Sequence, residues 1–148
     1  MPERNESDDW SIFDGPVEAT DHHRTDSNKR LTERFVREVL IERSAEALPG
    51  FLEGEAFTQH SHRWNDGAEE LRRLLSTVEG EHATVHRRLH RVLGEGDFVL
   101  TMSEGTLGGV HSALFDLFRI SADKVVEHWE VIEAIPPREQ WKNDNGKF

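Results

Sequence analysis

The stretch FDLFRISADKVVEHWEVI, residues 115–132, alternates apolar and polar side chains on both sides of a short break. Such alternation is typical of β-strands, because successive side chains of a strand point to opposite faces of the sheet. The dipeptide Ala122-Asp123 stands at the break and predicts a two-residue hairpin turn. The stretch therefore predicts an antiparallel hairpin whose second strand carries His128 and Glu130 on one face.

The predicted turn also sets the pairing of the two strands. It pairs Leu117 with His128 and Phe115 with Glu130, and it places His111 on the same face. This face is either a solvated sheet surface or the wall of a polar-lined pocket, and its apolar side chains favour the pocket. The opposite face is half apolar as well, so we expect a homodimer in which a second subunit covers one face of the sheet.

The rest of the chain places helices before strands. Helical spacing of apolar residues predicts three helices, and a period of two predicts the strands. The helices are expected at about 29–44, 44–52 and 67–77, and the strands at 56–60, 83–93, 98–104, 110–120 and 125–132. This order predicts an α+β domain in which a curved antiparallel sheet wraps its concave face over the helices.

The N-terminal region differs in composition from the remainder. Residues 1–27 are polar and acidic, and they predict a flexible arm outside the core. Residues 28–148 predict a single domain, because 148 residues suffice for one core. His22 and His23 fall in the predicted arm, where we expect no specific role.

Charge and composition exclude several classes of function. The formal net charge of −11 disfavours nucleic acid and anionic membranes as partners, because both are bound largely through Lys and Arg. The absence of cysteine excludes thiol nucleophiles, disulfides and cysteine metal sites. No apolar run approaches the roughly 20 residues of a membrane span, and the N-terminus lacks the layout of a signal peptide. We therefore expect a soluble, cytoplasmic protein.

Several motifs in the right order resemble one known family, the SnoaL-like polyketide cyclases of the nuclear transport factor 2-like superfamily. The resemblance covers residues 28–148 and is closest to the subgroup of predicted aldol-condensation-catalysing proteins. It implies a cone-shaped α+β fold, with N-terminal helices packed on a curved antiparallel sheet and a cavity between them. Enzymes and non-catalytic binding proteins share this fold. The motifs that carry the resemblance are FVREVL, AFTQHSHRWNDG, HRVLGEGDFVL, FDLFRISADKVVEHWEVI and NDNGKF.

The resemblance also implies candidate catalytic residues. His60 matches the QH of the family pattern and His128 the H of EHWD, so both are implied to face the cavity. Glu130 stands where the subgroup usually has aspartate. Glu133, four residues after Trp129, stands where the cyclases proper have their catalytic aspartate. The base is thus either Glu130 or Glu133, and the proton donor either His60 or His128.

These groups suggest proton abstraction next to a carbonyl group of a small organic ligand. A carboxylate in an apolar cavity becomes a usable base, and a nearby donor stabilises the developing enolate. Because the chain has no tyrosine, the indoles of Trp64 and Trp129 are alternative donors. The competing interpretation is a non-catalytic ligand-binding or dimerisation module in which His128 and Glu130 form a satisfied polar pair. The residues expected to line the pocket are His62, Trp64, His111, Phe115 and Leu117.

The spacing of three histidines raises the question of a metal site. His82, His86 and His90 recur every four residues, but strand residues four apart lie about 13 Å from each other, too far for one ion. Only a helix would bring them together, and a helix is also compatible with the apolar spacing of this segment. We expect neither a metal nor a cofactor.

Overall fold

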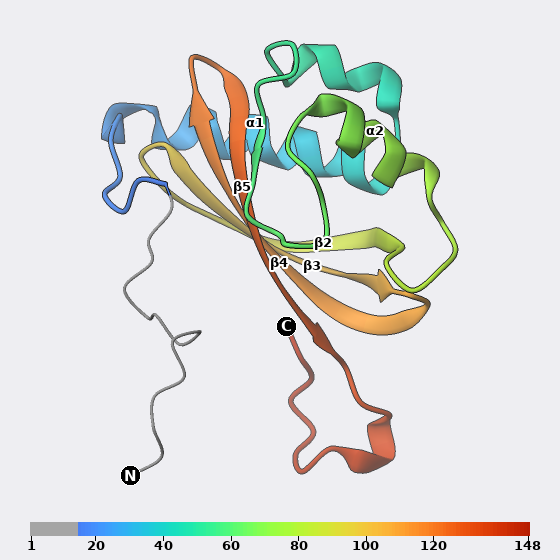
Figure 1. Ribbon diagram of the computed structural model, residues 1–148. Helices are drawn as coiled ribbons and strands as arrows, with labels where there is room; N and C mark the ends of the chain where they lie inside the picture. Colours follow the sequence, from blue (N-terminus) through green and yellow to red (C-terminus); the bar gives the residue numbers. More distant parts are fainter. Residues whose placement is uncertain (1–14) are drawn as a thin grey trace, which may run out of the picture.

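The computed structural model describes residues 15–148, so the first part of the predicted acidic arm, residues 1–14, lies outside the described residues. The chain forms one helical layer and one sheet, with α1 and α2 over the same face of the sheet (Figure 1). No helix within residues 15–148 is long and apolar enough to cross a membrane.

The helical layer follows the apolar spacing of the sequence. After the 3₁₀ turn η1 (His22–Arg24), α1 (Thr25–Phe35) continues as a π-helical stretch, η2 (Val36–Ile41). The 3₁₀ helix η3 (Ala45–Gly50) and α2 (Ala68–Ser76) complete the layer. Three helical segments at these places were predicted, and the first begins four residues earlier than expected. The residues that these elements bury include Phe35, Val36, Val39, Leu40, Leu48, Leu71, Leu74 and Leu75.

The sheet has five strands in the order β1-β5-β4-β3-β2. Neighbouring strands are antiparallel, except that β1 runs parallel to β5. The strongly twisted sheet curves around the helices (Figure 1), as the predicted α+β cone requires. The strands are β1 (Thr58–Gln59), β2 (Thr84–Glu95), β3 (Phe98–Leu107), β4 (Val110–Ser121) and β5 (Lys124–Ala134).

The core lies between the helices and the inner face of the sheet. Phe35 of α1 packs edge-on against both Phe51 and Phe118, with ring centroids 5.5 and 5.4 Å apart. Offset and edge-to-face packing is the favoured geometry for aromatic pairs. These contacts fix α1 on the centre of β4, directly beside the polar residues described below.

The β4–β5 hairpin turns at the predicted dipeptide, but its register differs from the prediction. Ala122 and Asp123 both have positive φ, at 48° and 60°, as the right-handed twist of a two-residue hairpin favours. Beyond the turn, Ile120 pairs with Val125 and Arg119 with Glu127. Val126 therefore has no partner and forms a β-bulge, which shifts all later pairs by one residue.

The shift decides which β4 residues face inward with His128. Phe118 pairs with His128 and Asp116 pairs with Glu130. The prediction that Phe115, Leu117 and His111 share a face with His128 is wrong, because a one-residue slip moves every side chain of a strand to the other face. These three residues lie on the outer face of the sheet, and Asp116 takes their place inside.

Part of the predicted arm packs on the domain. The Thr20 N–H donates to the Asp97 carboxylate at 2.8 Å, and the Asp97 N–H donates to the Thr20 carbonyl at 2.8 Å. A Cβ added at Gly96, where φ is +59°, would lie 2.1 Å from the Thr20 carbonyl oxygen. The β2–β3 turn thus needs glycine so that residue 20 can approach, and the structured region extends upstream of residue 28.

Arg43 joins the helical layer to the start of β2. It donates to the carbonyls of Leu74 and Leu75 at 2.9 and 3.0 Å, and to those of Thr77 and Thr84 at 3.1 and 3.2 Å. The carbonyls at the end of α2 have no intrahelical donors, so a charged side chain that satisfies them stabilises this end of the helix. The contact also holds β2 where it presents His86 to the interior.

We predict that Arg43→Met lowers the free energy of unfolding by about 2 kcal/mol, because charge-assisted hydrogen bonds to partly buried carbonyls are lost. Urea unfolding followed by circular dichroism measures the change. The control is Arg72→Met, which removes only exposed ion pairs with Glu55 and Glu69 and should cost less than about 1 kcal/mol. Equal effects of the two substitutions would contradict the role given to Arg43.

Candidate functional site

A small cavity lies between the inner face of the sheet and the helices. Its volume is about 30 Å³, which is room for roughly one water molecule. One side is apolar and the other is polar. The apolar lining is Phe35, Leu40, Phe57, Trp64, Leu71, Leu74 and Phe118, and the polar lining is Gln59, Thr84, His86, Asp116, His128 and Glu130.

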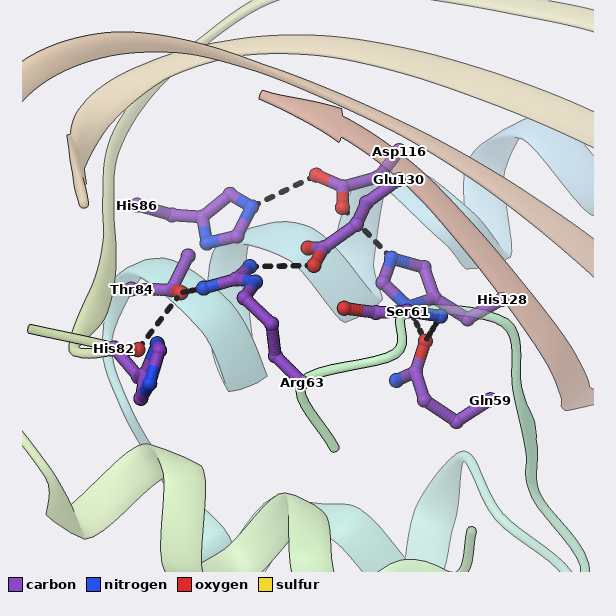
Figure 2. Close-up of polar contacts among 9 residues, drawn as sticks. All are labelled: Gln59, Ser61, Arg63, His82, Thr84, His86, Asp116, His128 and Glu130. Atoms are coloured by element: carbon purple, nitrogen blue, oxygen red, sulfur yellow. Dashed lines mark hydrogen bonds and ion pairs between the residues drawn. The ribbon is translucent and has the colours of Figure 1, made fainter. Parts of the chain in front are cut away.

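Asp116 is the centre of the polar side. It lies in the middle of β4 and is 1% exposed. Its Oδ1 is 2.7 Å from His128 Nε2 on β5, and its Oδ2 is 2.8 Å from His86 Nε2 on β2 (Figure 2). One carboxylate therefore accepts hydrogen bonds from two imidazoles that arrive from two other strands.

The two imidazoles keep Asp116 ionised. Burial alone would raise the pKa of Asp116, but the charge of His86 and hydrogen bonds from both rings outweigh burial and hold this pKa well below its ordinary value. At neutral pH Asp116 is thus a carboxylate and can only accept hydrogen bonds.

Gln59 fixes the protonation of His128. The Ser61 N–H donates to Gln59 Oε1 at 3.0 Å, which identifies that atom as the amide oxygen. His128 Nδ1 is 2.9 Å from the same oxygen, so Nδ1 must donate (Figure 2). Nε2 must also donate, because its partner is the Asp116 carboxylate. This pattern is that of an imidazolium with both protons engaged.

His86 differs from His128 in having one ring nitrogen unused. Its Nε2 donates to Asp116, while Nδ1 has no hydrogen bond to residues 15–148 and is turned toward Arg63 and Thr84 (Figure 2). An imidazole oriented by a carboxylate and carrying a bare nitrogen is the arrangement of a general base.

An ion pair lies beside these groups. Arg63, in the loop between β1 and α2, donates to Glu130 Oε1 at 2.5 Å and to Thr84 Oγ1 at 3.5 Å. Its guanidinium also lies 5.5 Å from the centre of the Trp64 ring. Trp64 Nε1 is buried with no partner within the described chain. Because an unpaired buried N–H is costly, this indole is a donor available to a ligand oxygen.

Three of these residues also lie close enough together to hold a metal ion. Asp116, His128 and Glu130 each offer a ligand atom within 4.8 Å of the others. A cation there would have to replace the proton that His128 shares with Asp116, and it would lie near the guanidinium of Arg63. The donor set is therefore a better fit to a proton network than to a metal ion.

Three of the predicted site residues line the cavity: His128, Glu130 and Trp64. His60 does not, because it lies on the outer side, where Nε2 is 2.6 Å from Glu127 and its ring stacks on Trp129 at 4.5 Å. The implied position of His60 in the cavity is wrong: Gln59, its neighbour in β1, holds the inward position. The other predicted residues that lie outside the cavity lining are His62, His111, Phe115, Leu117 and Glu133.

Glu133 lies too far along β5 to reach the cavity. It is exposed and pairs with Lys147 at 2.8 Å. Sequence reasoning missed His86, Arg63 and the central role of Asp116. The alternation of β2 does contain the signal for His86, because it places that residue on a buried face. The position of Asp116 beside His128 could be predicted only with knowledge of the bulge at Val126.

Comparison with known proteins supports the fold. No protein-family model matches the chain, and no curated protein matches it. Solved structures do match: a predicted ketosteroid isomerase from Kribbella flavida has 15% identity and a TM-score of 0.64, and covers 84% of this chain and 94% of its own.

Two other solved structures are similar. A predicted SnoaL-like polyketide cyclase from Jannaschia has 17% identity and a TM-score of 0.59, over 80% of this chain and 92% of its own. An LEH-like epoxide hydrolase from M. tuberculosis has 17% identity and a TM-score of 0.57, and the match covers 74% of this chain and 85% of the hydrolase. The chain therefore has the nuclear transport factor 2-like α+β fold that SnoaL-like proteins share.

We predict that Asp116→Asn destabilises the protein by about 3–5 kcal/mol at pH 7, because it leaves the His128 imidazolium buried without its counter-charge. Since the pKa of Asp116 is lower in the folded than in the unfolded protein, its stabilisation is present above about pH 4 and is lost as the pH falls further.

Chemical denaturation from pH 3 to pH 8 measures both effects. Asp116→Asn should flatten the acidic part of the stability profile, whereas Asp144→Asn, at a side chain 88% exposed, should leave it unchanged. An acidic limb of the same size in Asp116→Asn and in the parent protein would contradict the ionised state assigned to Asp116.

Proposed function

We propose that the protein is a small-molecule enzyme that carries out cofactor-independent acid/base chemistry on a carbonyl compound, of the aldol cyclase or isomerase type. The observation that carries the proposal is His86, which Asp116 orients and whose bare Nδ1 belongs to the same cavity as the unpaired Nε1 of Trp64. Similarity of fold to cyclases and isomerases is consistent with this chemistry but does not establish it.

In this proposal His86 Nδ1 removes a proton from the carbon next to the carbonyl group. The imidazolium that forms is stabilised by the Asp116 carboxylate. The carbonyl oxygen gains negative charge and accepts hydrogen bonds from Trp64 Nε1 and the Arg63 guanidinium. The enolate then either regains the proton at another carbon, which is isomerisation, or attacks a second carbonyl carbon, which is an aldol reaction.

Glu130 and His128 have different roles in this scheme from those first expected. Glu130 is engaged by Arg63 at 2.5 Å, so it orients the donor and becomes a base only if that pair opens. His128 has both ring protons engaged by Gln59 and Asp116, which makes it a positioning residue for Asp116. The predicted roles of both residues as direct acid and base are thus replaced by His86 and the donors.

The size of the cavity favours a second candidate, a non-catalytic binding or dimerisation module. About 30 Å³ admits no organic substrate unless the loop that carries Arg63 and Trp64 moves. Catalysis requires this opening, whereas a merely filled interior does not. The two candidates therefore differ in whether ligands enter and in whether His86 affects turnover.

A homodimer through the outer face of the sheet is part of the proposal. Apolar side chains remain half-exposed or exposed on this face, among them Val131 at 69%. Contiguous exposed apolar side chains on a sheet are typical of a subunit interface. The others on this face are Phe98, Leu100, Met102, Phe115, Leu117 and Trp129.

We predict that His86→Gln lowers turnover about 10²- to 10⁴-fold, the usual contribution of a general base. The assay is proton NMR of deuterium incorporation next to the carbonyl group in a panel of ketones and β-dicarbonyl compounds in D₂O. The matched control is His60→Gln, which changes a histidine on the outer side of the sheet. Loss of exchange with Glu130→Gln but not with His86→Gln would assign the base to Glu130, and exchange by neither protein nor variants would favour the binding module.

We predict that Val131→Glu converts a dimer to a monomer, because it places a charge in the centre of the proposed interface. Light scattering after size-exclusion chromatography reports the mass. Val78→Glu is the control, since Val78 is similarly exposed, at 61%, but lies between α2 and β2. If the parent protein is monomeric, or if Val131→Glu remains dimeric, this interface is wrong.

A further inference from the structure

A surface groove between α1 and β2 has four cationic side chains among its nine lining residues. Its volume is about 400 Å³. Lys29, Arg30, Arg37 and Arg91 line it together with Asp26, Glu33 and His90, and the apolar residues Leu89 and Val92 are also in its wall. This groove, called the basic groove below, lies away from the cavity that holds Asp116, with which it shares no lining residue.

The cations of the basic groove are unusual in this chain. Most arginines of the described domain have a carboxylate partner, as Arg72, Arg73 and Arg119 do. Within residues 15–148, no carboxylate forms an ion pair with Lys29, Arg30 or Arg91; Arg37 is paired with Glu33. Arg87 and Arg88, which are exposed on the same strand, β2, likewise have no carboxylate partner in the described part of the chain. Unpaired positive charge is thus concentrated along α1 and β2.

The remaining surface is negative. The chain has 29 acidic and 18 basic side chains, and residues 1–14 contain five of the acidic ones and one of the basic ones. The described domain therefore has 24 acidic and 17 basic side chains, a net charge of −7. An acidic segment is repelled by most of this surface and attracted to the basic groove. The N-terminal segment MPERNESDDWSIFD is acidic, with a net side-chain charge of −4, and it also contains Trp10, Ile12 and Phe13.

The N-terminal segment is long enough to reach the groove. A Cβ added at Gly15 would lie 2.9 Å from Trp129 on β5, so the described chain begins on the outer face. Trp129 pairs with Leu117, Leu117 with Leu100, and Leu100 with Leu93 of β2. The start of the described chain is thus separated from β2, at a position two residues from Arg91, by about three strand spacings of 4.8 Å. Fourteen extended residues span up to about 46–50 Å, well beyond this distance.

We propose that the acidic N-terminal segment, residues 1–14, binds in the basic groove of its own chain. The carboxylates of Glu6, Asp8 and Asp9 pair with the cations of α1 and β2, and an apolar side chain of the segment contacts Leu89 and Val92. Exposed ion pairs are individually weak and are screened by salt. The segment therefore exchanges between bound and free states, and salt shifts the balance toward the free state.

Paramagnetic relaxation tests this placement in the full chain. Because the protein has no cysteine, Ser7→Cys gives a single site for a nitroxide label. At low ionic strength the amide signals of Lys29, Arg30 and residues 89–92 should weaken about twofold or more, and at 1 M salt, where the Debye length is about 3 Å, they should recover.

Substitutions and mixing identify the contact. The triple change Lys29→Gln, Arg30→Gln and Arg91→Gln should abolish the weakening, whereas Lys142→Gln, at an exposed lysine of the C-terminal region, should leave it intact. Absence of weakening at the groove in low salt would overturn the proposal. Weakening that appears only when labelled chains are mixed with isotope-enriched unlabelled chains would also overturn it, because the occupant would then be a second copy.

Discussion

The buried carboxylate of Asp116 is the interaction on which the interior depends. It accepts hydrogen bonds from His86 of β2 and His128 of β5 while it lies on β4, so one side chain joins three strands of the sheet. A carboxylate buried in this way is stable only when its partners supply donors and positive charge. The same requirement determines the proton positions along a chain of hydrogen bonds. The Ser61 N–H and His128 Nδ1 both donate to Gln59, and His128 and His86 both donate to Asp116. The chemistry of the cavity thus follows from how one acid is satisfied.

The bulge at Val126 makes this arrangement possible. Without it, Asp116 and His128 would lie on opposite faces of the sheet, Leu117 would share a face with His128, and His128 would lose its carboxylate partner. The bulge costs one unpaired residue near the turn and brings His128 to the same face as Asp116. β-Bulges often occur next to functional sites, where they redirect a side chain. We regard Val126 as the feature of the fold that selects the polar side of the cavity.

Much of the fold was predictable from the sequence, and the site was predictable in part. The apolar spacing of residues 29–44 and 67–77 and the alternation of the four long strands predicted the helices and strands that the structure has. The alternation of side chains along β5 also predicted that His128 and Glu130 lie on the same face of the sheet, which is correct. The pairing of β4 with β5 was not predictable, because a bulge leaves the alternation of each strand intact on either side of it. For this reason the sequence suggested Phe115 and Leu117 as lining residues and not Asp116.

Nitrogen-15 NMR of the histidine side chains at neutral pH reports which ring nitrogens of His128 and His86 carry protons. The signals of these two residues can be assigned with His86→Gln and His128→Gln. We expect His128 to carry a proton on both ring nitrogens, and His86 to be protonated on Nε2 with a bare Nδ1. A neutral His128 with one bare nitrogen, or a His86 that carries its proton on Nδ1, would contradict the proton arrangement on which the proposed chemistry rests.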